Sequence, residues 1–329
     1  MSNIKVNSNF HTLSEKSLFD NPDIKFQEYR RKWKENPEKG IVEDFPLFLD
    51  IEVTSVCNLK CPFCATTFRG NIIEKGFMKI ELLKKIIDEG SEKGLYGCKF
   101  NIRGEPLLHK EIDKFVEYSK KKGLIDVYFN TNAQLLTYDM SLKLIDAGLD
   151  RISISIESYK KEIYEKYRFP GKFDVLLNNI ESLLKAKKNR KVDFPKIRIQ
   201  TVLINEVKND LENYKNFWQQ YCDEVSYLDY KEMKGKKYGI KSDWVCPELW
   251  QRMAVWWDGT ILPCNHDDEG LLKLGDVNTD KIEKCWDSDL INIIRKKYKF
   301  GLAHEVKACD GCYLRDSEIN KPHKIRRIE

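Results

Sequence analysis

Between residues 45 and 230, short apolar runs alternate with longer segments in which apolar residues recur every three or four positions. The short runs predict buried strands, and the longer segments predict amphipathic helices. The predicted strands are Leu47–Val53, Cys98–Ile102, Asp126–Asn130, Arg151–Ile156, Ile197–Leu203 and Val225–Leu228. The predicted helices are Lys79–Lys93, Leu108–Lys122, Tyr138–Ala147, Val175–Lys188 and Asp210–Tyr221.

Strands that alternate with helices in this way predict an α/β fold with a parallel sheet and helices outside it. Right-handed crossovers would curl such a sheet toward a barrel, with functional residues on the loops at the C-terminal strand ends. The flanking segments differ from this pattern. Residues 1–45 are polar apart from an amphipathic stretch near Ile24–Trp33, and residues 231–245 form a linker rich in Lys and Gly. We therefore divide the chain into an N-terminal extension (1–45), a core (46–230), the linker (231–245) and a C-terminal domain (246–329).

Composition narrows the class of protein. The 329 residues are 41% hydrophobic and 12% aromatic, which is typical of a folded globular chain and excludes intrinsic disorder. No run approaches the roughly 18 apolar residues of a membrane span, and the N-terminus has no apolar signal core. The formal net charge of +5 is spread over many side chains rather than one block. We expect a cytoplasmic protein that binds neither membranes nor nucleic acid.

The first group of cysteines lies just after the first predicted strand. Cys57, Cys61 and Cys64 have C-x3-C-x2-C spacing. In a reducing compartment, cysteines at such spacing are metal ligands or buried thiols rather than disulfides. Three thiolates can bind three irons of a [4Fe–4S] cluster and leave the fourth iron open for chemistry.

A second group of cysteines lies near the C-terminus. Its members are Cys246, Cys264, Cys309 and Cys312. Four thiolates close a metal site, so a fully bound cluster and a structural zinc both fit this group. The remaining single cysteines are Cys98, Cys222 and Cys285.

The order of motifs in the core resembles the radical S-adenosylmethionine (SAM) superfamily. A strand precedes the three cysteines, Phe63 stands before the last of them, and the next strand ends in Gly104-Glu105-Pro106. The resemblance covers about residues 46–230 and implies a partial (β/α)6 TIM-like barrel. It also implies that SAM binds the open iron of the cluster and yields a 5′-deoxyadenosyl radical, which abstracts hydrogen from an unactivated carbon.

The resemblance also implies which residues touch the cofactor. Cys57, Cys61 and Cys64 would hold the cluster. Glu105 would offset the charge of the methionine ammonium, and Arg168 would pair with the methionine carboxylate. Arg103 stands where the family has a glycine. The full set of expected SAM contacts is Phe63, Gly104, Glu105, Asn130, Asn132, Ser155, Glu157 and Arg168.

The C-terminal region, about residues 246–315, resembles a SPASM domain truncated to the shorter twitch form. Asp258-Gly259 predicts a hairpin turn between Met253–Trp257 and Ile261–Pro263. The resemblance implies that the four cysteines hold one auxiliary [4Fe–4S] cluster, whose role is electron transfer. Both cluster regions are similar to those of the twitch-type dehydrogenase that oxidises an amino-cyclitol in butirosin biosynthesis.

From these features we expect a radical SAM oxidoreductase that oxidises an alcohol of a small hydroxylated substrate to a ketone. A sugar, nucleotide sugar or cyclitol is the expected substrate, and a flavodoxin or ferredoxin is the expected electron donor. Candidates for the catalytic base are Asp229, Tyr230 and Glu232. The aromatic pair Trp256-Trp257 is a candidate for sugar-phosphate binding or for packing.

Three alternatives remain open at this point. A sugar epimerase would need a thiol as hydrogen donor. Cys222 is the single cysteine that we would test, since Cys98 at the start of a strand is expected at the wrong end of the barrel and Cys285 is expected in the core. A ribosomal-peptide maturase is the second alternative, although residues 1–45 show no clear leader-binding pattern. The third is an iron–sulfur or zinc scaffold without catalysis.

Overall fold

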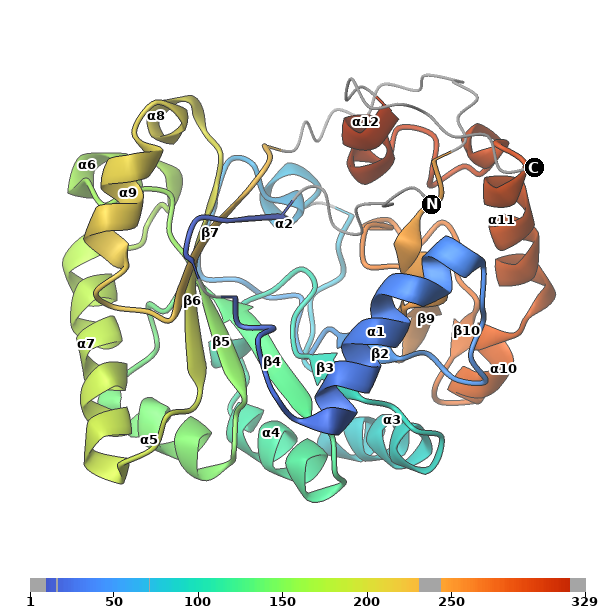
Figure 1. Cartoon of the computed structure of the whole chain (residues 1–329), viewed down its shortest axis with the longest axis horizontal. Coiled ribbons are helices and arrows are strands. Elements are labelled where there is room, and N and C mark those ends of the chain that lie inside the picture. The colour runs from blue at the N-terminus through green and yellow to red at the C-terminus, as the bar shows by residue number, and fades with distance from the viewer. Residues whose placement is uncertain (1–9, 16, 71, 231–243, 320–329) are drawn as a thin grey trace.

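The computed structural model describes residues 10–15, 17–70, 72–230 and 244–319 (Figure 1). Its strands form one sheet in the order β1-β7-β6-β5-β4-β3-β2-β8-β9-β10. The strands are β1 Phe10–Thr12, β2 Phe48–Ile51, β3 Gly97–Lys99, β4 Asp126–Thr131, β5 Arg151–Ser155, β6 Lys196–Val202, β7 Glu224–Leu228, β8 Arg252–Val255, β9 Thr260–Leu262 and β10 Gly275–Asp276.

Strands β2 to β7 are parallel to their neighbours and form an open, barrel-like wall. This arrangement confirms the predicted α/β class and the partial barrel. Each of the six predicted strands is present, with ends that differ by a few residues.

Helices cover the outside of this wall, most visibly α3, α4, α5 and α7 (Figure 1). The α-helices are α1 Ile24–Lys39, α2 Ala65–Phe68, α3 Ile80–Glu92, α4 Ile112–Lys121, α5 Tyr138–Asp146, α6 Lys161–Tyr167, α7 Phe173–Arg190, α8 Asn205–Lys208, α9 Leu211–Trp218, α10 Ile282–Trp286, α11 Asp289–Lys299 and α12 Tyr313–Ile319. Short 3₁₀ helices are η1 Pro106–Leu108, η2 Pro247–Trp250 and η3 Ala303–Glu305. The chain that the structure describes contains no helix long and apolar enough to cross a membrane.

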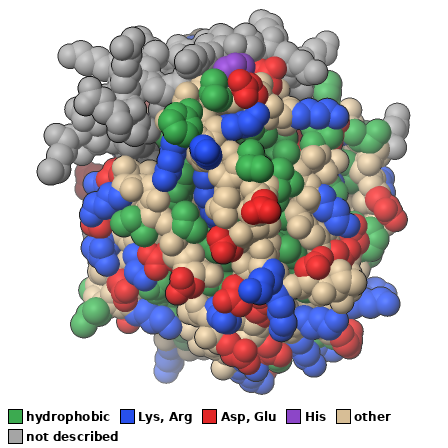
Figure 2. Space-filling view, turned by 90° about the vertical axis from the view of Figure 1, so that its right-hand side faces the viewer, with side chains coloured by type: hydrophobic (Ala, Val, Ile, Leu, Met, Phe, Trp, Pro, Cys, Tyr) green, Lys and Arg blue, Asp and Glu red, His purple; other side chains and the backbone are tan. Residues whose placement is uncertain are grey.

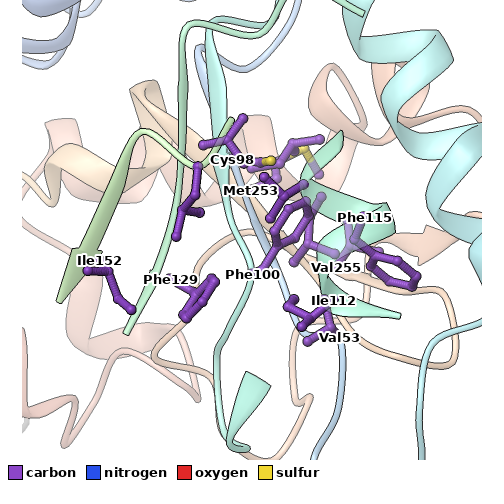
Figure 3. Packing of buried hydrophobic residues seen from close by; sticks show 14 of the residues in the cluster. Val53, Cys98, Phe100, Ile112, Phe115, Phe129, Ile152, Met253 and Val255 are labelled. Atoms are coloured by element: carbon purple, nitrogen blue, oxygen red, sulfur yellow. The ribbon is translucent and has the colours of Figure 1, made fainter. Parts of the chain in front are cut away.

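The two faces of the barrel wall differ in polarity because side chains alternate along a strand. On β5, Ile152 and Ile154 face outward into the hydrophobic core beneath the helices, whereas Arg151, Ser153 and Ser155 face inward. Figure 3 shows members of the outer core, including Ile152, Phe129, Phe100 and Met253. The interior of the barrel is therefore polar, and this is where a site can form.

Helix α1 closes the barrel at the amino ends of its strands. Its buried residues Phe26, Tyr29 and Trp33 form a second hydrophobic cluster with Phe48 at the start of β2 and Tyr96 just before β3. Tyr29 stacks on Tyr96 with ring centroids 5.2 Å apart. The amphipathic stretch in the N-terminal extension is thus the start of a 16-residue helix that packs against the barrel.

The C-terminal domain extends the same sheet. Strand β8 pairs in parallel with β2, and β9 and β10 follow in antiparallel order. The predicted hairpin is present, and Gly259 at its turn has φ +103°, a conformation that favours glycine. Figure 2 shows one face on this side of the molecule, where Lys and Arg side chains are mixed with Asp and Glu.

Candidate active site

A cavity of ≈ 440 Å³ lies inside the barrel. Its lining includes the inward side chains of β3 to β6, all three cysteines of the first group, and residues of the C-terminal domain. At its other end it reaches Phe19 before α1 and Tyr29, Arg30 and Trp33 on α1. The cavity therefore runs from the carboxyl ends of the strands to the helix that closes the barrel.

The first three cysteines lie on the loop that follows β2. Cys64 caps the start of α2, and its backbone N–H donates to the Cys61 carbonyl at 3.1 Å. Burial raises the pKa of Cys57 to about 12 and that of Cys61 to about 11. Thiols this reluctant to ionise become thiolates when a cation such as iron binds them. Three cysteines that line one cavity fit the open cluster that the spacing predicts.

Gly104 makes a close approach that no other residue could make. A Cβ atom at this position would stand 2.1 Å from the Thr54 carbonyl oxygen and 2.8 Å from that of Val56. The glycine therefore lets the turn after β3 pack on the loop after β2. The resemblance implied a close approach to the cofactor, and the contact seen here is with the chain itself.

Glu105 lines the cavity and joins two segments of the chain. Its Oε1 accepts from the Thr131 hydroxyl at 2.6 Å and the Leu107 N–H at 3.1 Å, and its Oε2 accepts from the Asn132 N–H at 2.8 Å. Burial raises the pKa of Glu105, and these donors act in the opposite direction. Its contacts within the chain organise the turn after β3 and the end of β4.

Arg103 joins the core to the C-terminal domain. Its guanidinium donates to both carboxylate oxygens of Glu52, at 2.6 and 2.7 Å, and to the Asp268 carbonyl at 3.2 Å. It also lies 3.6 Å from the ring centroid of Trp256. The arginine at this position, where the family has a glycine, therefore has a structural role that the sequence pattern did not indicate.

Trp257 and Trp256 pack against glycines of the surrounding loops. A Cβ on Gly76 would meet the Trp257 ring at 2.3 Å, and one on Gly270 would meet the Trp256 ring at 2.8 Å. The structure thus favours packing over sugar-phosphate binding for this pair.

Glu157 and Arg168 form a buried ion pair beside the cysteines. Arg168 Nη2 donates to Glu157 Oε1 at 2.6 Å, and Arg168 Nε donates to the second carboxylate oxygen. Arg168 also donates a hydrogen bond to Cys61 and lies 5.5 Å from the ring centroid of Phe63. Arg168 and Phe63 line the cavity. The bidentate pairing of Arg168 with Glu157 was not predicted from the sequence.

The remaining expected cofactor contacts also line the cavity. Asn132 donates from Nδ2 to the Asn58 side-chain oxygen at 2.8 Å. The Asn130 backbone N–H donates to Asn101 Oδ1 at 2.8 Å, which connects β4 to the end of β3. Ser155 lies on the wall beside Gln200.

The four cysteines of the second group come together from distant segments. Cys246 precedes η2, Cys264 follows β9, and Cys309 and Cys312 precede α12. Burial raises the pKa of Cys264 well above its usual value, and nearby Cys246, Cys309 and Cys312 act in the same direction. Four sulfurs that influence one another in a buried place fit a closed cluster.

Metal geometry bears on the zinc alternative. Among the described residues, no group of three or more His, Cys, Asp or Glu side chains is arranged to hold one metal ion. The ligands of a [4Fe–4S] cluster surround a larger group, with a cysteine on each iron.

A chain of polar residues that sequence reasoning missed lies next to these cysteines. His266 Nε2 stands 3.1 Å from Glu248 Oε1, and His266 Nδ1 shares a hydrogen bond with the Tyr313 hydroxyl. All three residues line the cavity. Burial alone would raise the pKa of Glu248, but His266 and Arg252 together hold it at about 2. Each residue follows a cysteine by one or two positions, and that proximity was the available signal.

The three candidates for the catalytic base differ in their position relative to the cavity. Asp229 lines the cavity and lies 3.5 Å from the His11 ring nitrogen. Tyr230 is half exposed and contacts Phe63 edge-on, whereas Glu232 lies outside the described residues.

Cys222 does not line the cavity. It precedes the amino end of β7, and its thiol donates to the Trp218 carbonyl at 3.3 Å. This placement does not favour Cys222 as a hydrogen donor, because a substrate near the first three cysteines would lie toward the opposite end of the strands. Cys285 belongs to the hydrophobic core, as expected, and so does Cys98.

Sequence comparison decides the family. The sequence model of the radical SAM superfamily matches residues 51–217, and that of the SPASM iron–sulfur cluster-binding domain matches residues 246–313. The chain belongs to the radical SAM superfamily. The radical SAM domain binds a [4Fe–4S] cluster and SAM, and the SPASM domain binds auxiliary iron–sulfur clusters. Both cofactor predictions are thereby confirmed.

Curated relatives of this radical SAM chain include GTP 3′,8-cyclases. The enzyme of Clostridium botulinum (strain Hall) is 29% identical over 187 residues, which cover 55% of this chain and 56% of that protein. The probable GTP 3′,8-cyclase of Methanocaldococcus jannaschii is 26% identical over 196 residues, or 58% of this chain and 63% of that protein. The chain thus spans less than two thirds of the length of these relatives.

Solved structures show the same fold at low identity. BtrN in complex with AdoMet and 2-DOIA has a TM-score of 0.53 and 19% identity, covering 83% of this chain and 93% of BtrN. Native anSMEcpe with bound AdoMet has a TM-score of 0.63 and 16% identity, covering 83% and 95%. Streptococcus suis SuiB bound to the precursor peptide SuiA has a TM-score of 0.54 and 18% identity, covering 96% and 82%.

Proposed function

We propose that this radical SAM enzyme is an oxidoreductase that oxidises an alcohol of a small hydroxylated substrate to a ketone. The substrate would be a sugar, nucleotide sugar or cyclitol. The observation that carries the proposal is the second cysteine group, whose four thiols come together next to cavity-lining residues and would leave no cluster iron open for substrate. A closed cluster at that place suits electron transfer from a substrate radical.

We assign the cofactors to the residues that the sequence predicted. Cys57, Cys61 and Cys64 would hold the first cluster, and the four C-terminal cysteines would hold the auxiliary cluster. When bound, these groups supply the redox chemistry: the first cluster and SAM generate a 5′-deoxyadenosyl radical, and the auxiliary cluster accepts an electron. The residues proposed to contact SAM are Phe63, Gly104, Glu105, Asn130, Asn132, Ser155, Glu157 and Arg168.

The chain itself would bind and orient the substrate and move a proton. Inward side chains of the barrel offer hydrogen bonds to hydroxyl groups, as Asn130, Ser155 and Gln200 do on neighbouring strands. Asp229 stands on the cavity wall after β7, so its carboxylate is our candidate to accept the proton of the oxidised hydroxyl. A flavodoxin or ferredoxin would supply the low-potential electron that the reaction needs.

Two other functions can be compared with the proposed oxidation: epimerisation of a sugar and a reaction within a purine nucleotide. Epimerisation gains less support, because Cys222 is not among the residues that line the cavity. The 29% identity to GTP 3′,8-cyclases favours a second candidate function, in which the radical attacks within a purine nucleotide.

The test uses reconstituted protein under anaerobic conditions with SAM, a reductant, and pools of sugars, nucleotide sugars, cyclitols and GTP. 5′-Deoxyadenosine and the masses of the pool are followed together. We expect one hydroxylated compound to lose two hydrogens as 5′-deoxyadenosine forms. Rearrangement of GTP without loss of two hydrogens would favour the second candidate. Uptake of solvent deuterium without a change in composition would contradict the oxidation.

A further inference from the structure

The floor of the cavity, which we define as Phe19, Arg30, Arg151 and Arg198, carries a concentration of positive charge. The three guanidinium groups surround the ring of Phe19 at 4.0, 5.3 and 5.4 Å from its centroid. The ring and all three arginines line the cavity. They lie at the end remote from the cysteines, where α1 closes the barrel.

Carboxylates balance only part of this charge. Arg151 forms a bidentate ion pair with Asp126, at 2.7 and 2.8 Å, and Arg198 donates to Glu224 at 2.6 Å. The recorded contacts of Arg30 are with the rings of Phe19, Tyr29 and Trp33. Within the described residues, two of the three guanidinium groups thus form ion pairs with carboxylates. Burial lowers the pKa of Arg198, and the neighbouring charge of Arg151 lowers it further.

Two buried polar atoms, one on a floor residue and one on its neighbour Ser153 on β5, lack hydrogen-bond partners within the described chain. Arg151 Nη1 is one, on a side chain that is only 6% exposed. The Ser153 hydroxyl is another, on a residue that is 1% exposed and faces the same side of β5. A buried polar group without a partner costs about 1–3 kcal/mol, so such groups in a native protein indicate a bound water, ion or ligand. Both atoms can donate a hydrogen bond, which is what an anion requires.

We propose that this floor binds a phosphoryl group of the substrate, so that the substrate is a sugar phosphate or a nucleotide sugar rather than a neutral sugar or cyclitol. The inference rests on the proposed function and narrows its substrate class. Arginine suits this task, because its planar donors match the oxygens of a phosphate. A phosphoryl group on the floor would leave the other end of the substrate directed along the cavity toward Cys57, Cys61 and Cys64.

The first arm of the test measures anion binding on the reconstituted holoenzyme, under anaerobic conditions and at constant ionic strength. The probes are pyrophosphate, inorganic phosphate and a sugar 1-phosphate, with the neutral sugar as comparison, and the readouts are calorimetric affinity and melting temperature. We expect the sugar phosphate and pyrophosphate to bind and the neutral sugar to bind at least about tenfold more weakly, since a hydrogen bond to a charged group is worth about this much.

Variants locate the binding at the floor. Arg30→Gln removes the positive charge of a guanidinium group that lines the cavity. We expect the variant to bind the sugar phosphate about tenfold more weakly, because a hydrogen bond to a charged group is lost. Arg31→Gln is the matched control, because Arg31 lies on the same helix but pairs with Glu35 on the exposed face. Ser153→Ala should weaken binding several-fold without lowering the melting temperature in the absence of the probe, since its hydroxyl has no partner within the described chain.

Several results would overturn the inference. In one, none of the phosphate probes binds, which would mean that water alone provides the hydrogen-bond partners of the polar atoms at the floor. In another, Arg30→Gln and Arg31→Gln bind the sugar phosphate equally well. If inorganic phosphate binds as tightly as the sugar phosphate and Arg30→Gln leaves the KM for the substrate unchanged, the floor is an ion site apart from the substrate.

The second arm separates this inference from the proposed function. If a neutral sugar loses two hydrogens as readily as its phosphate, the oxidoreductase proposal stands and the phosphoryl site fails. If phosphate probes bind and Arg30→Gln weakens them, but no pool member loses two hydrogens, the site stands and the oxidoreductase proposal fails.

Discussion

The two cysteine regions present the same ligand in two different ways. The first places three cysteines on a single loop of eight residues after β2, at the mouth of the barrel interior. The second gathers four cysteines from three segments of the C-terminal domain. Burial raises the pKa of Cys57 and Cys61 in the first set and of Cys246, Cys264 and Cys309 in the second. The difference lies in ligand number, since three cysteines leave an iron open for SAM and four leave none.

The comparison indicates that cysteine ligands in different number could give two iron–sulfur clusters different roles beside one cavity. The open site suits radical formation, and the closed site suits removal of an electron. Glu248, His266 and Tyr313 line the wall beside the closed site, whereas Phe63 and Arg168 line the wall beside the open one. Arg103 connects the two sides.

The largest effect is expected from loss of the open site. Cys61→Ala should abolish 5′-deoxyadenosine formation, because two cysteines hold the first cluster poorly and SAM loses its iron. Iron content should fall by one cluster while the second cluster remains. Anaerobic iron quantification and chromatography of 5′-deoxyadenosine measure both. Retention of 5′-deoxyadenosine formation would contradict the assignment of Cys61.

The second-largest effect is expected when Arg103, which connects the two regions, is replaced. Arg103→Met leaves Glu52 as a buried charge without its bidentate partner, so the free energy of unfolding should fall by about 3–5 kcal/mol. Arg190→Met is the matched control, because its bidentate pair with Asp146 is exposed and worth about 1 kcal/mol or less. Chemical denaturation of the reconstituted proteins measures both. If the free energy of unfolding fell equally in the two variants, the Arg103–Glu52 pair would contribute no more than an exposed ion pair.

A smaller effect is expected at Glu105. Glu105→Gln keeps the shape of the side chain but replaces one acceptor oxygen with an amide, which cannot accept from its present donors. The free energy of unfolding should fall by about 1–3 kcal/mol, and SAM should bind more weakly. Glu283→Gln, at an exposed ion pair with Lys93, controls for the loss of charge. Unchanged SAM affinity in Glu105→Gln would limit Glu105 to a structural role.

The smallest effect is expected at Cys222. Cys222→Ser keeps a donor for the hydrogen bond to the Trp218 carbonyl, and position 222 does not line the cavity. The rate of product formation should therefore change less than twofold, which corresponds to a change of less than ~0.4 kcal/mol in activation free energy. The assay is the rate at which substrate is consumed per 5′-deoxyadenosine. Loss of product with 5′-deoxyadenosine intact would restore the epimerase alternative.

The local features of this protein were predictable from its sequence. The predicted strands overlap β2 to β7 because their outward residues are continuously apolar, as Ile152 and Ile154 illustrate. The first cysteine group is readable because its spacing is set within one loop. The hairpin of the C-terminal domain follows from Asp258-Gly259 for the same reason.

Features that depend on distant contacts were not predictable. The amphipathic pattern of α1 was visible, but its packing at the amino ends of the strands requires Phe48 and Tyr96 to be brought beneath it. Arg103 gains its role from Glu52 and Trp256, which the sheet places beside it through the pairing of β2 with β8. The floor of the cavity likewise exists only when neighbouring strands bring Arg151 and Arg198 together.

The most direct test of the central claim compares the wild-type enzyme with Cys264→Ser on the substrate that the pool identifies. The measurement is the ratio of substrate that loses two hydrogens to 5′-deoxyadenosine formed, under anaerobic conditions. Our account predicts a ratio near one for the wild type. It predicts that Cys264→Ser still forms 5′-deoxyadenosine but yields little oxidised product, because the closed site can no longer accept the electron. An unchanged ratio in Cys264→Ser would contradict the division of roles between the two cysteine regions.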